Sequence, residues 1–181
     1  MNTVFKEADN LLRNFKNWEI KSQRFDPLAE DIDTVLSEHR LEEIKLKGDL
    51  EKARYLEGND NRFTFFRNNI IKDLNLVLEQ EFNTQVNDTG LYWYPRGGYC
   101  GWHTNSDAQN NNRTGKRIYL VWAQDESKSF FRYKDRESGA IITNWDKKGW
   151  QVKEFNLTKE DPLWHCVGSK TNRISIGFNF N

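Results

Sequence analysis

Seven short segments in the second half of the chain alternate apolar and polar residues with a period of two, and this pattern constrains the fold most. They begin after Thr89, and clusters of Gly, Asn, Asp and Pro separate them. Successive side chains of a strand point to opposite faces of its sheet, so such alternation is typical of half-buried strands. The segments are 91–94, 117–122, 129–133, 140–145, 150–155, 163–167 and 173–180. Seven or eight short strands at this spacing predict a sandwich or jelly roll.

The first part of the chain shows a helical period instead. Residues 28–39 carry apolar side chains three or four positions apart, and residues 66–83 carry a second stripe of this kind. The highly charged stretch between them, 40–54, is compatible with a continued helix. The sequence therefore predicts an α+β fold in one domain, with mainly helical support over 1–88 that covers one sheet of a strand-rich core over 89–181.

Composition restricts the class of protein. The 27 basic and 27 acidic residues cancel, so no overall field attracts nucleic acid or an anionic membrane. Twelve Phe, seven Trp and six Tyr argue against disorder. No apolar run is long enough for a membrane helix, and the first residues do not resemble a secretory signal. Because Cys100 and Cys166 do not form a CxxC pair, a soluble cytoplasmic protein is the simplest expectation.

Two histidines and an arginine form the candidate site. His165 and Arg173 are eight residues apart, and His103 lies about sixty residues upstream of them. Imidazole nitrogens suit Fe, Zn, Cu or Ni, whereas a guanidinium beside a hydroxyl suits a carboxylate. In the last predicted strand Arg173 and Ser175 share one face, and the opposite face is entirely apolar and must pack. The pattern indicates a site for a divalent metal and an organic dianion.

Each of the two histidines directly follows a tryptophan, in Trp102-His103 and in Trp164-His165. In an extended strand the indole and the imidazole point to opposite sides, so the tryptophan fills the core while the histidine faces the cavity. The third histidine, His39, lies on the apolar stripe of the first predicted helix and is interpreted as an ordinary core residue.

The two cysteines and four basic residues near the candidate site say less about function than the histidines and Arg173. Cys166 adjoins His165 and Cys100 precedes His103 by three positions, so both thiols are expected to point away from the histidine face. That expectation argues against a Cys–His hydrolase. Four basic residues near the expected mouth of the cavity are interpreted as solvated loop charges rather than as contacts for an anionic substrate: Arg96, Arg113, Lys116 and Arg117.

These motifs resemble those of the iron(II)- and 2-oxoglutarate-dependent oxygenases, especially the small prolyl-hydroxylase-like branch. The resemblance covers about residues 89–181 and rests on three runs of sequence. They are Tyr94-Pro-Arg-Gly-Gly before His103, Pro162-Leu-Trp before His165, and Arg173-Ile-Ser175. It implies a double-stranded β-helix, or jelly roll, with N-terminal supporting helices.

The resemblance also implies a ligand set. Iron(II) would be held at one open end of the barrel by His103 and His165. 2-Oxoglutarate would chelate the iron and reach Arg173 and Ser175, with Tyr94 or Tyr119 as an additional partner.

One position departs from the family pattern. The acidic ligand is expected two residues after the first histidine, yet position 105 is Asn. An amide oxygen can coordinate iron but brings no negative charge. Three interpretations stay open. Asn105 is a neutral ligand, which its spacing favours; its place is taken by water or an anion, as in the halogenase branch; or Asp107 supplies the carboxylate.

The resemblance implies an enzyme, a 2-oxoglutarate-dependent dioxygenase that hydroxylates a C–H bond and releases succinate and carbon dioxide. Because of Asn105 there are two alternatives. One is a metal- and 2-oxoglutarate-binding protein of the same fold with altered catalysis, and the other is a halogenase-type variant. The substrate stays open among a small molecule, a peptide side chain and a nucleobase. The sequence does not determine the oligomeric state.

Overall fold

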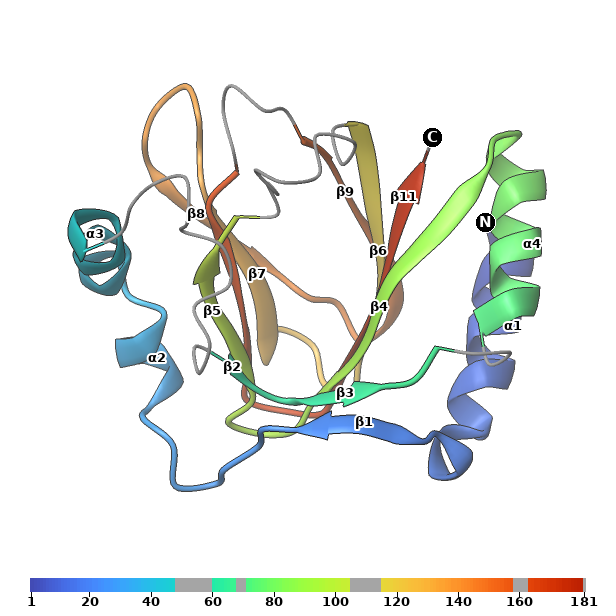
Figure 1. Cartoon of the computed structure of the whole chain (residues 1–181), viewed down its shortest axis with the longest axis horizontal. Helices are drawn as coiled ribbons and strands as arrows, with labels where there is room; N and C mark the ends of the chain where they lie inside the picture. Colours follow the sequence, from blue (N-terminus) through green and yellow to red (C-terminus); the bar gives the residue numbers. More distant parts are fainter. Residues whose placement is uncertain (48–59, 68–70, 105–114, 158–162, 181) are drawn as a thin grey trace.

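A computed structural model describes residues 1–47, 60–67, 71–104, 115–157 and 163–180. Two antiparallel sheets face each other, and helices lie outside both of them (Figure 1). From β4 onward the chain passes repeatedly from one sheet to the other, so the last two strands lie in opposite sheets. This is a jelly-roll arrangement, and it confirms the predicted mixture of helices with a two-sheet core.

The larger sheet has six strands in the order β1-β3-β4-β11-β6-β9. In that order their bounds are Ile20–Gln23, Phe63–Phe65, Val86–Tyr94, Arg173–Phe180, Gly115–Ala123 and Gly149–Leu157. The smaller sheet has five strands in the order β2-β5-β10-β7-β8. Their bounds are Asp60–Asn61, Tyr99–His103, His165–Ser169, Ser129–Lys134 and Ile141–Trp145.

The apolar face of β11 packs on helices, as its alternation predicts. Ile174, Ile176 and Phe178 are at most 2% exposed and join one hydrophobic cluster with side chains of α1 (Asn2–Arg13) and α4 (Lys72–Phe82). Figure 1 shows both helices on the outer side of the larger sheet. Burying each such side chain contributes about 1.5–3 kcal/mol, so this layer fixes which face of β11 points inward.

The smaller sheet is covered by α2 (Ile32–Val35) and α3 (Glu38–Lys47). Trp102 is 1% exposed in this second cluster, and its Nε1 donates to the backbone oxygen of Ser37 at 2.9 Å. The tryptophan therefore fills the core behind the sheet, as the Trp-His pattern predicts, and the preceding helices are attached to the strand that carries His103.

The N-terminal part is less helical than predicted. The stripe over 28–39 is not one helix, because α2 begins only at Ile32, where the Asp31 carboxylate caps it. Leu28 is 91% exposed, and the side chain of His39 is 85% exposed beside Glu43, so the interpretation of His39 as a core residue was wrong.

Strands also occur in the part of the chain, 1–88, that was expected to be mainly helical. Strands β1, β2 and β3 lie in this region, and α1 and the 3-10 turn Phe15–Asn17 were not predicted. The second predicted helix is present as α4 and ends at Asn83, whose φ of 49° is a left-handed cap. Of the charged stretch 40–54, the part after residue 47 lies outside the described residues. No helix in the described ranges is long and apolar enough to cross a bilayer.

Candidate functional site

His103 and His165 lie side by side at one end of the smaller sheet. They are cross-strand partners in β5 and β10, and their ring centroids are 4.2 Å apart. His165 is 2% exposed. The rings of Phe131 and Phe155 lie with their centroids 5.2 and 5.7 Å from that of His165. The fold thus brings together two histidines about sixty residues apart, beside an apolar wall.

The Nδ1 atom of each histidine contacts a backbone carbonyl. His103 Nδ1 lies 2.7 Å from the oxygen of Gly101, and His165 Nδ1 lies 2.9 Å from the oxygen of Leu163. A carbonyl oxygen only accepts, so these contacts assign the ring proton to Nδ1 in both neutral histidines. Nε2 is then the nitrogen with the lone pair that a metal requires, and the backbone fixes the orientation of each ring.

The two rings differ in electrostatic setting. Burial lowers the pKa of His165 well below its usual value, and the charge of His103 adds to this effect. For His103 burial also lowers the pKa, but the interaction with Cys100 and the hydrogen bond to the Gly101 carbonyl together outweigh burial and raise it. Since a metal binds the neutral ring, His165 is already in the required form at neutral pH.

Cys100 was expected to point away from the histidines, and this prediction was wrong. Its Sγ lies 3.6 Å from His103 Nδ1, on the inner side of the sheet. The reason is a bulge, because His165 pairs with His103 while Val167 pairs with Cys100. Three residues of β5 thus span the length of two in β10, which shifts the alternation by one position. Cys166 follows the prediction and packs behind the sheet with Trp102.

Arg173 and Ser175 are buried between the sheets, on the inner face of β11. Arg173 is 1% exposed, and its Nε donates to Asp146 Oδ2 at 2.8 Å. The guanidinium carbon lies 5.3 Å from the centre of the Tyr94 ring. Arg173 Nη1 is buried and has no hydrogen-bond partner among the described residues. A buried donor without an acceptor is costly, so this atom is a natural contact for an anion.

Asp146 and Lys153 were missed in the sequence. The Lys153 ammonium lies 3.0 Å from Asp146 Oδ1, and the Ser129 hydroxyl donates to Asp146 Oδ2 at 2.7 Å. Burial alone would raise the pKa of Asp146, but the charges of Arg173 and Lys153 outweigh it and lower that pKa. Two cations therefore share one carboxylate, which leaves a net positive charge for a ligand. For Lys153 the sequence did contain a signal, because it lies two positions before Phe155 and so shares the inward face of β9 with that residue.

The two candidate tyrosines lie on the inner face of the larger sheet. The Tyr94 hydroxyl accepts a hydrogen bond from Arg62 Nη1 at 2.7 Å. Burial raises the pKa of Tyr94, so its phenol remains protonated and able to donate. The Tyr119 ring stacks on Phe155 with centroids 5.7 Å apart, which places it near the wall that contacts His165.

Both candidates for a third metal ligand fall outside the described part of the chain. Asn105, Asp107 and the basic residue Arg113 all lie within 105–114, which the structure does not describe. Among the described residues no group of three His, Cys, Asp or Glu side chains is arranged to hold a metal ion. His103 and His165 are therefore two candidate donors, and a metal held by them would need another donor from outside this group.

The remaining basic residues of the expected mouth behave differently from one another. Arg96 is exposed, and Lys116 forms a half-exposed ion pair with Glu154 at 2.8 Å. Arg117 is only 3% exposed, so its interpretation as a solvated loop charge was wrong. The physical reason is that β6 already begins at Gly115, and pairing on both sides places Arg117 inside the sheet.

A pocket of about 400 Å³ lies next to His165, between β7 and β9. Three residues of its wall, Phe131, Phe155 and Leu163, also contact this histidine through their rings or backbone. The wall is completed by Tyr133, Arg136, Asn144, Val152, Lys153, Glu154 and Asn156. This volume is in the range of small-molecule sites, which is roughly 300–1,000 Å³.

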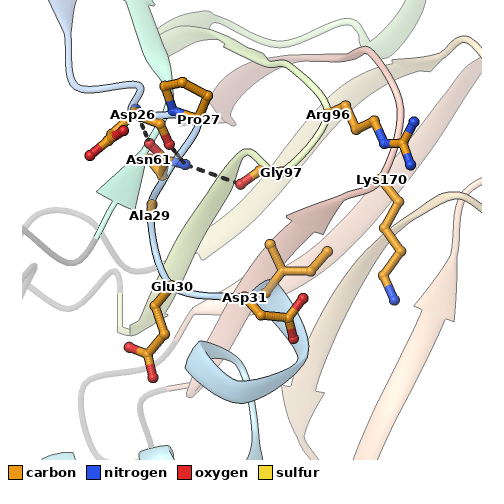
Figure 2. A pocket seen from close by; sticks show the side chains of 10 residues that line it. Asp26, Pro27, Ala29, Glu30, Asp31, Asn61, Arg96, Gly97 and Lys170 are labelled. Atoms are coloured by element: carbon orange, nitrogen blue, oxygen red, sulfur yellow. Dashed lines mark hydrogen bonds between the residues drawn. The ribbon is translucent and has the colours of Figure 1, made fainter.

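A second hollow of about 570 Å³ lies outside the barrel, between the chain before α2 and the turns at Gly97 and Lys170 (Figure 2). The acidic side chains of this hollow already form hydrogen bonds and an ion pair within the fold. Asp26 accepts from the backbone of Leu28, Asp31 caps α2, and Glu30 binds Arg40. These contacts account for the acidic wall, and neither histidine lines this hollow.

No protein-family model matches the sequence, and the search of curated proteins found no match. Among solved structures, the chain is similar to a prolyl hydroxylase from Trichoplax adhaerens in complex with a hypoxia inducible factor peptide fragment. The identity is 13%, covering 99% of this chain and 90% of that chain, with a TM-score of 0.48.

A Pseudomonas putida prolyl-4-hydroxylase is similar at 12% identity, covering 99% and 86% of the two chains, with a TM-score of 0.47. An oxidoreductase of the 2OG-Fe(II) oxygenase family from Burkholderia pseudomallei is similar at 11% identity, covering 96% and 89%, with a TM-score of 0.41. These are similarities of overall arrangement at low sequence identity.

Proposed function

We propose that the protein is an iron(II)- and 2-oxoglutarate-dependent oxygenase that hydroxylates a C–H bond of its substrate. The observation that supports this most is the combination of two features in one barrel interior. One is the pair His103 and His165, each oriented through Nδ1 by a backbone carbonyl. The other is Arg173, which is buried on the facing sheet and whose Nη1 has no hydrogen-bond partner in the described part of the chain.

The metal would be held by Nε2 of His103 and His165, with Asn105 or Asp107 as the third protein ligand. Imidazole suits iron, and the two rings, with centroids 4.2 Å apart, provide neighbouring donors. When bound, the iron would supply oxidation by dioxygen coupled to conversion of 2-oxoglutarate into succinate and carbon dioxide. The backbone contacts at Nδ1 keep both rings oriented for this role.

The distal carboxylate of 2-oxoglutarate would be bound by Arg173 and the hydroxyl of Ser175. Asp146 holds Arg173 by Nε, so the guanidinium is oriented before the ligand arrives. Lys153 adds a second positive charge at this position, which compensates for the negative charge of Asp146. A charge-assisted pair in such a buried setting is worth roughly 2–5 kcal/mol when one partner is removed.

The apolar wall around His165 would exclude water from the reacting centre. Phe131 and Phe155 lie against the ring, and Leu163 provides the carbonyl that orients it. Electrostatic interactions with charged ligands are stronger where water is excluded. The adjacent pocket of about 400 Å³ would accommodate a substrate of small-molecule size.

An anaerobic titration tests the proposal. Protein loaded with iron(II) is titrated with 2-oxoglutarate in a calorimeter, then exposed to air and assayed for succinate. We expect one 2-oxoglutarate bound per chain and succinate formed on exposure to air. Absence of 2-oxoglutarate binding to the loaded protein would reject the function.

Because position 105 is Asn and not an acidic residue, the same assay has two further informative outcomes. Binding of 2-oxoglutarate without succinate, with or without candidate substrates, would identify a binding protein of this fold. A chlorinated product formed in the presence of chloride would identify a halogenase-type variant.

A further inference from the structure

We propose that Arg117 binds the carboxylate of a small organic acid, and that this acid is the molecule that reacts beside His165. The inference rests on the proposed function and deepens it by naming the chemical class of the substrate. It depends on the position of Arg117, on the lack of a counter-ion for it among the described residues, and on its separation from Arg173.

Arg117 lies at the histidine end of the barrel interior. In β6 it is the cross-strand partner of Phe155 in β9 and of Asn179 in β11 (Figure 1). The Phe155 ring in turn packs on the ring of His165, with centroids 5.7 Å apart. Burial is the main reason for the low pKa of His165, but the charge of Arg117 also lowers it, in agreement with this proximity.

The guanidinium of Arg117 has no carboxylate partner among the described residues. The residue is 3% exposed, and its Nε donates to Asn179 Oδ1 at 2.7 Å. Its Nη2 is buried with no hydrogen-bond partner in the described ranges. A buried guanidinium bonded only to a neutral amide is unfavourable, since neither its charge nor its donors are fully compensated. An incoming carboxylate would supply both the opposite charge and the missing acceptor.

This position is distinct from the one proposed for 2-oxoglutarate. Arg173 begins β11, whereas Arg117 pairs with Asn179, six residues further along the same strand. Six residues of strand span about 20 Å at 3.3 Å per residue. Each guanidinium stays at the level of its own strand position, because that of Arg173 lies beside its cross-strand partner Tyr94 and that of Arg117 bonds its cross-strand partner Asn179. A five-carbon dicarboxylate is shorter than this separation, so it does not join the two positions. Arg173 also already has Asp146 as a partner, whereas the hydrogen-bond partner of Arg117 in the described ranges is an amide. The two arginines therefore indicate two separate anions.

Acetate is a suitable probe for the carboxylate, with acetamide as its neutral counterpart. The complete protein, held at saturating 2-oxoglutarate in a buffer without other carboxylates, is titrated while the Arg117 Nε–H resonance is followed by NMR. We expect a saturable shift with acetate and none with acetamide. Equal responses to the two probes, or no saturable response to acetate, would overturn the inference, and this comparison requires no variant.

Variants make the assignment specific. In Arg117→Gln, acetate binding measured by calorimetry should weaken at least tenfold, whereas the exposed Arg96→Gln should bind acetate as the wild type does. Affinity for 2-oxoglutarate should stay within twofold in Arg117→Gln. Acetate binding retained in Arg117→Gln would overturn the inference while leaving the proposed function intact. Loss of 2-oxoglutarate binding in the wild type would instead reject the proposed function.

Discussion

Asp146 and Arg173 form an ion pair in the interior of the barrel, with Arg173 Nε donating to Asp146 Oδ2 at 2.8 Å. Both residues are 1% exposed. The candidate anion-binding arginine is thus also part of the charged core. Substitutions at this pair are expected to change both the stability of the fold and the affinity for a ligand, and the two effects can be separated.

Replacing Asp146 by Asn should destabilise the protein by about 3–5 kcal/mol, because it leaves Arg173 and Lys153 buried without a counter-charge. Urea unfolding measures this free energy. Glu154→Gln is a matched control, since it breaks the half-exposed pair with Lys116, which is worth about 0–1 kcal/mol. Similar losses in the two variants would contradict the importance of the buried pair.

The same carboxylate predicts a pH dependence. Burial opposes ionisation of Asp146, but Arg173 and Lys153 hold its folded pKa below the usual value of 3.8. The stabilisation it provides is therefore complete above the unfolded-state pKa and is lost as the pH falls through the lower folded pKa. Urea unfolding in steps from about pH 6 to about pH 2.5 should show the stability difference between wild type and Asp146→Asn shrinking only below about pH 4. A difference that already shrinks near neutral pH would contradict this assignment.

The histidine pair predicts metal stoichiometry. Wild-type protein should bind one divalent ion per chain, and His103→Ala and His165→Ala should each abolish this binding in equilibrium dialysis. His39→Ala is the control, because His39 is exposed on α3. If both interior variants retained full binding, the histidines would not be the ligands.

Arg173→Gln should weaken 2-oxoglutarate binding about 30-fold or more, equivalent to at least 2 kcal/mol, while leaving the metal in place. The double variant Arg173→Gln/Asp146→Asn separates function from folding. Removing both partners should restore part of the stability but none of the affinity. Calorimetry that finds unchanged affinity in the single variant would exclude Arg173 as the anion-binding residue.

The role of position 105 in metal binding can be tested without knowledge of the substrate. If Asn105 occupies the ligand position, Asn105→Asp adds a negative charge with little change in shape, and iron(II) affinity should rise. Asp107→Asn should leave that affinity nearly unchanged. The reverse pattern, with iron lost in Asp107→Asn and unaffected in Asn105→Asp, would assign the ligand to Asp107.

The strands of the second half of the chain could be predicted because the alternation of apolar and polar residues is visible within each short segment. In β11, for example, Arg173 and Ser175 face inward while Ile174 and Phe178 pack on helices, as their spacing implies. The orientation of His103 opposite Trp102 was accessible for the same reason. These predictions required only the two-residue period of a strand.

Other features depend on pairing between distant segments. The bulge that turns Cys100 inward is defined by the register of β5 against β10, which the composition of β5 does not reveal. The Asp146–Arg173 pair joins a loop to a strand 27 residues later. Short strands β1 to β3 lie outside the predicted helical stripes and form by pairing with distant strands of the two sheets, which is tertiary context that so short a segment does not reveal.

Strands β10 and β11 each have a neighbour on both sides, whereas β8 and β9 are edge strands of their sheets. Edge strands open at a lower free energy than central ones, so backbone amides of β8 and β9 should exchange with deuterated water before those of β10 and β11. The edge strands also line or flank the pocket beside His165. Fluctuations of β8 and β9 that widen this pocket would therefore leave the two central strands paired, and a ligand would enter without partial unfolding of β10 and β11.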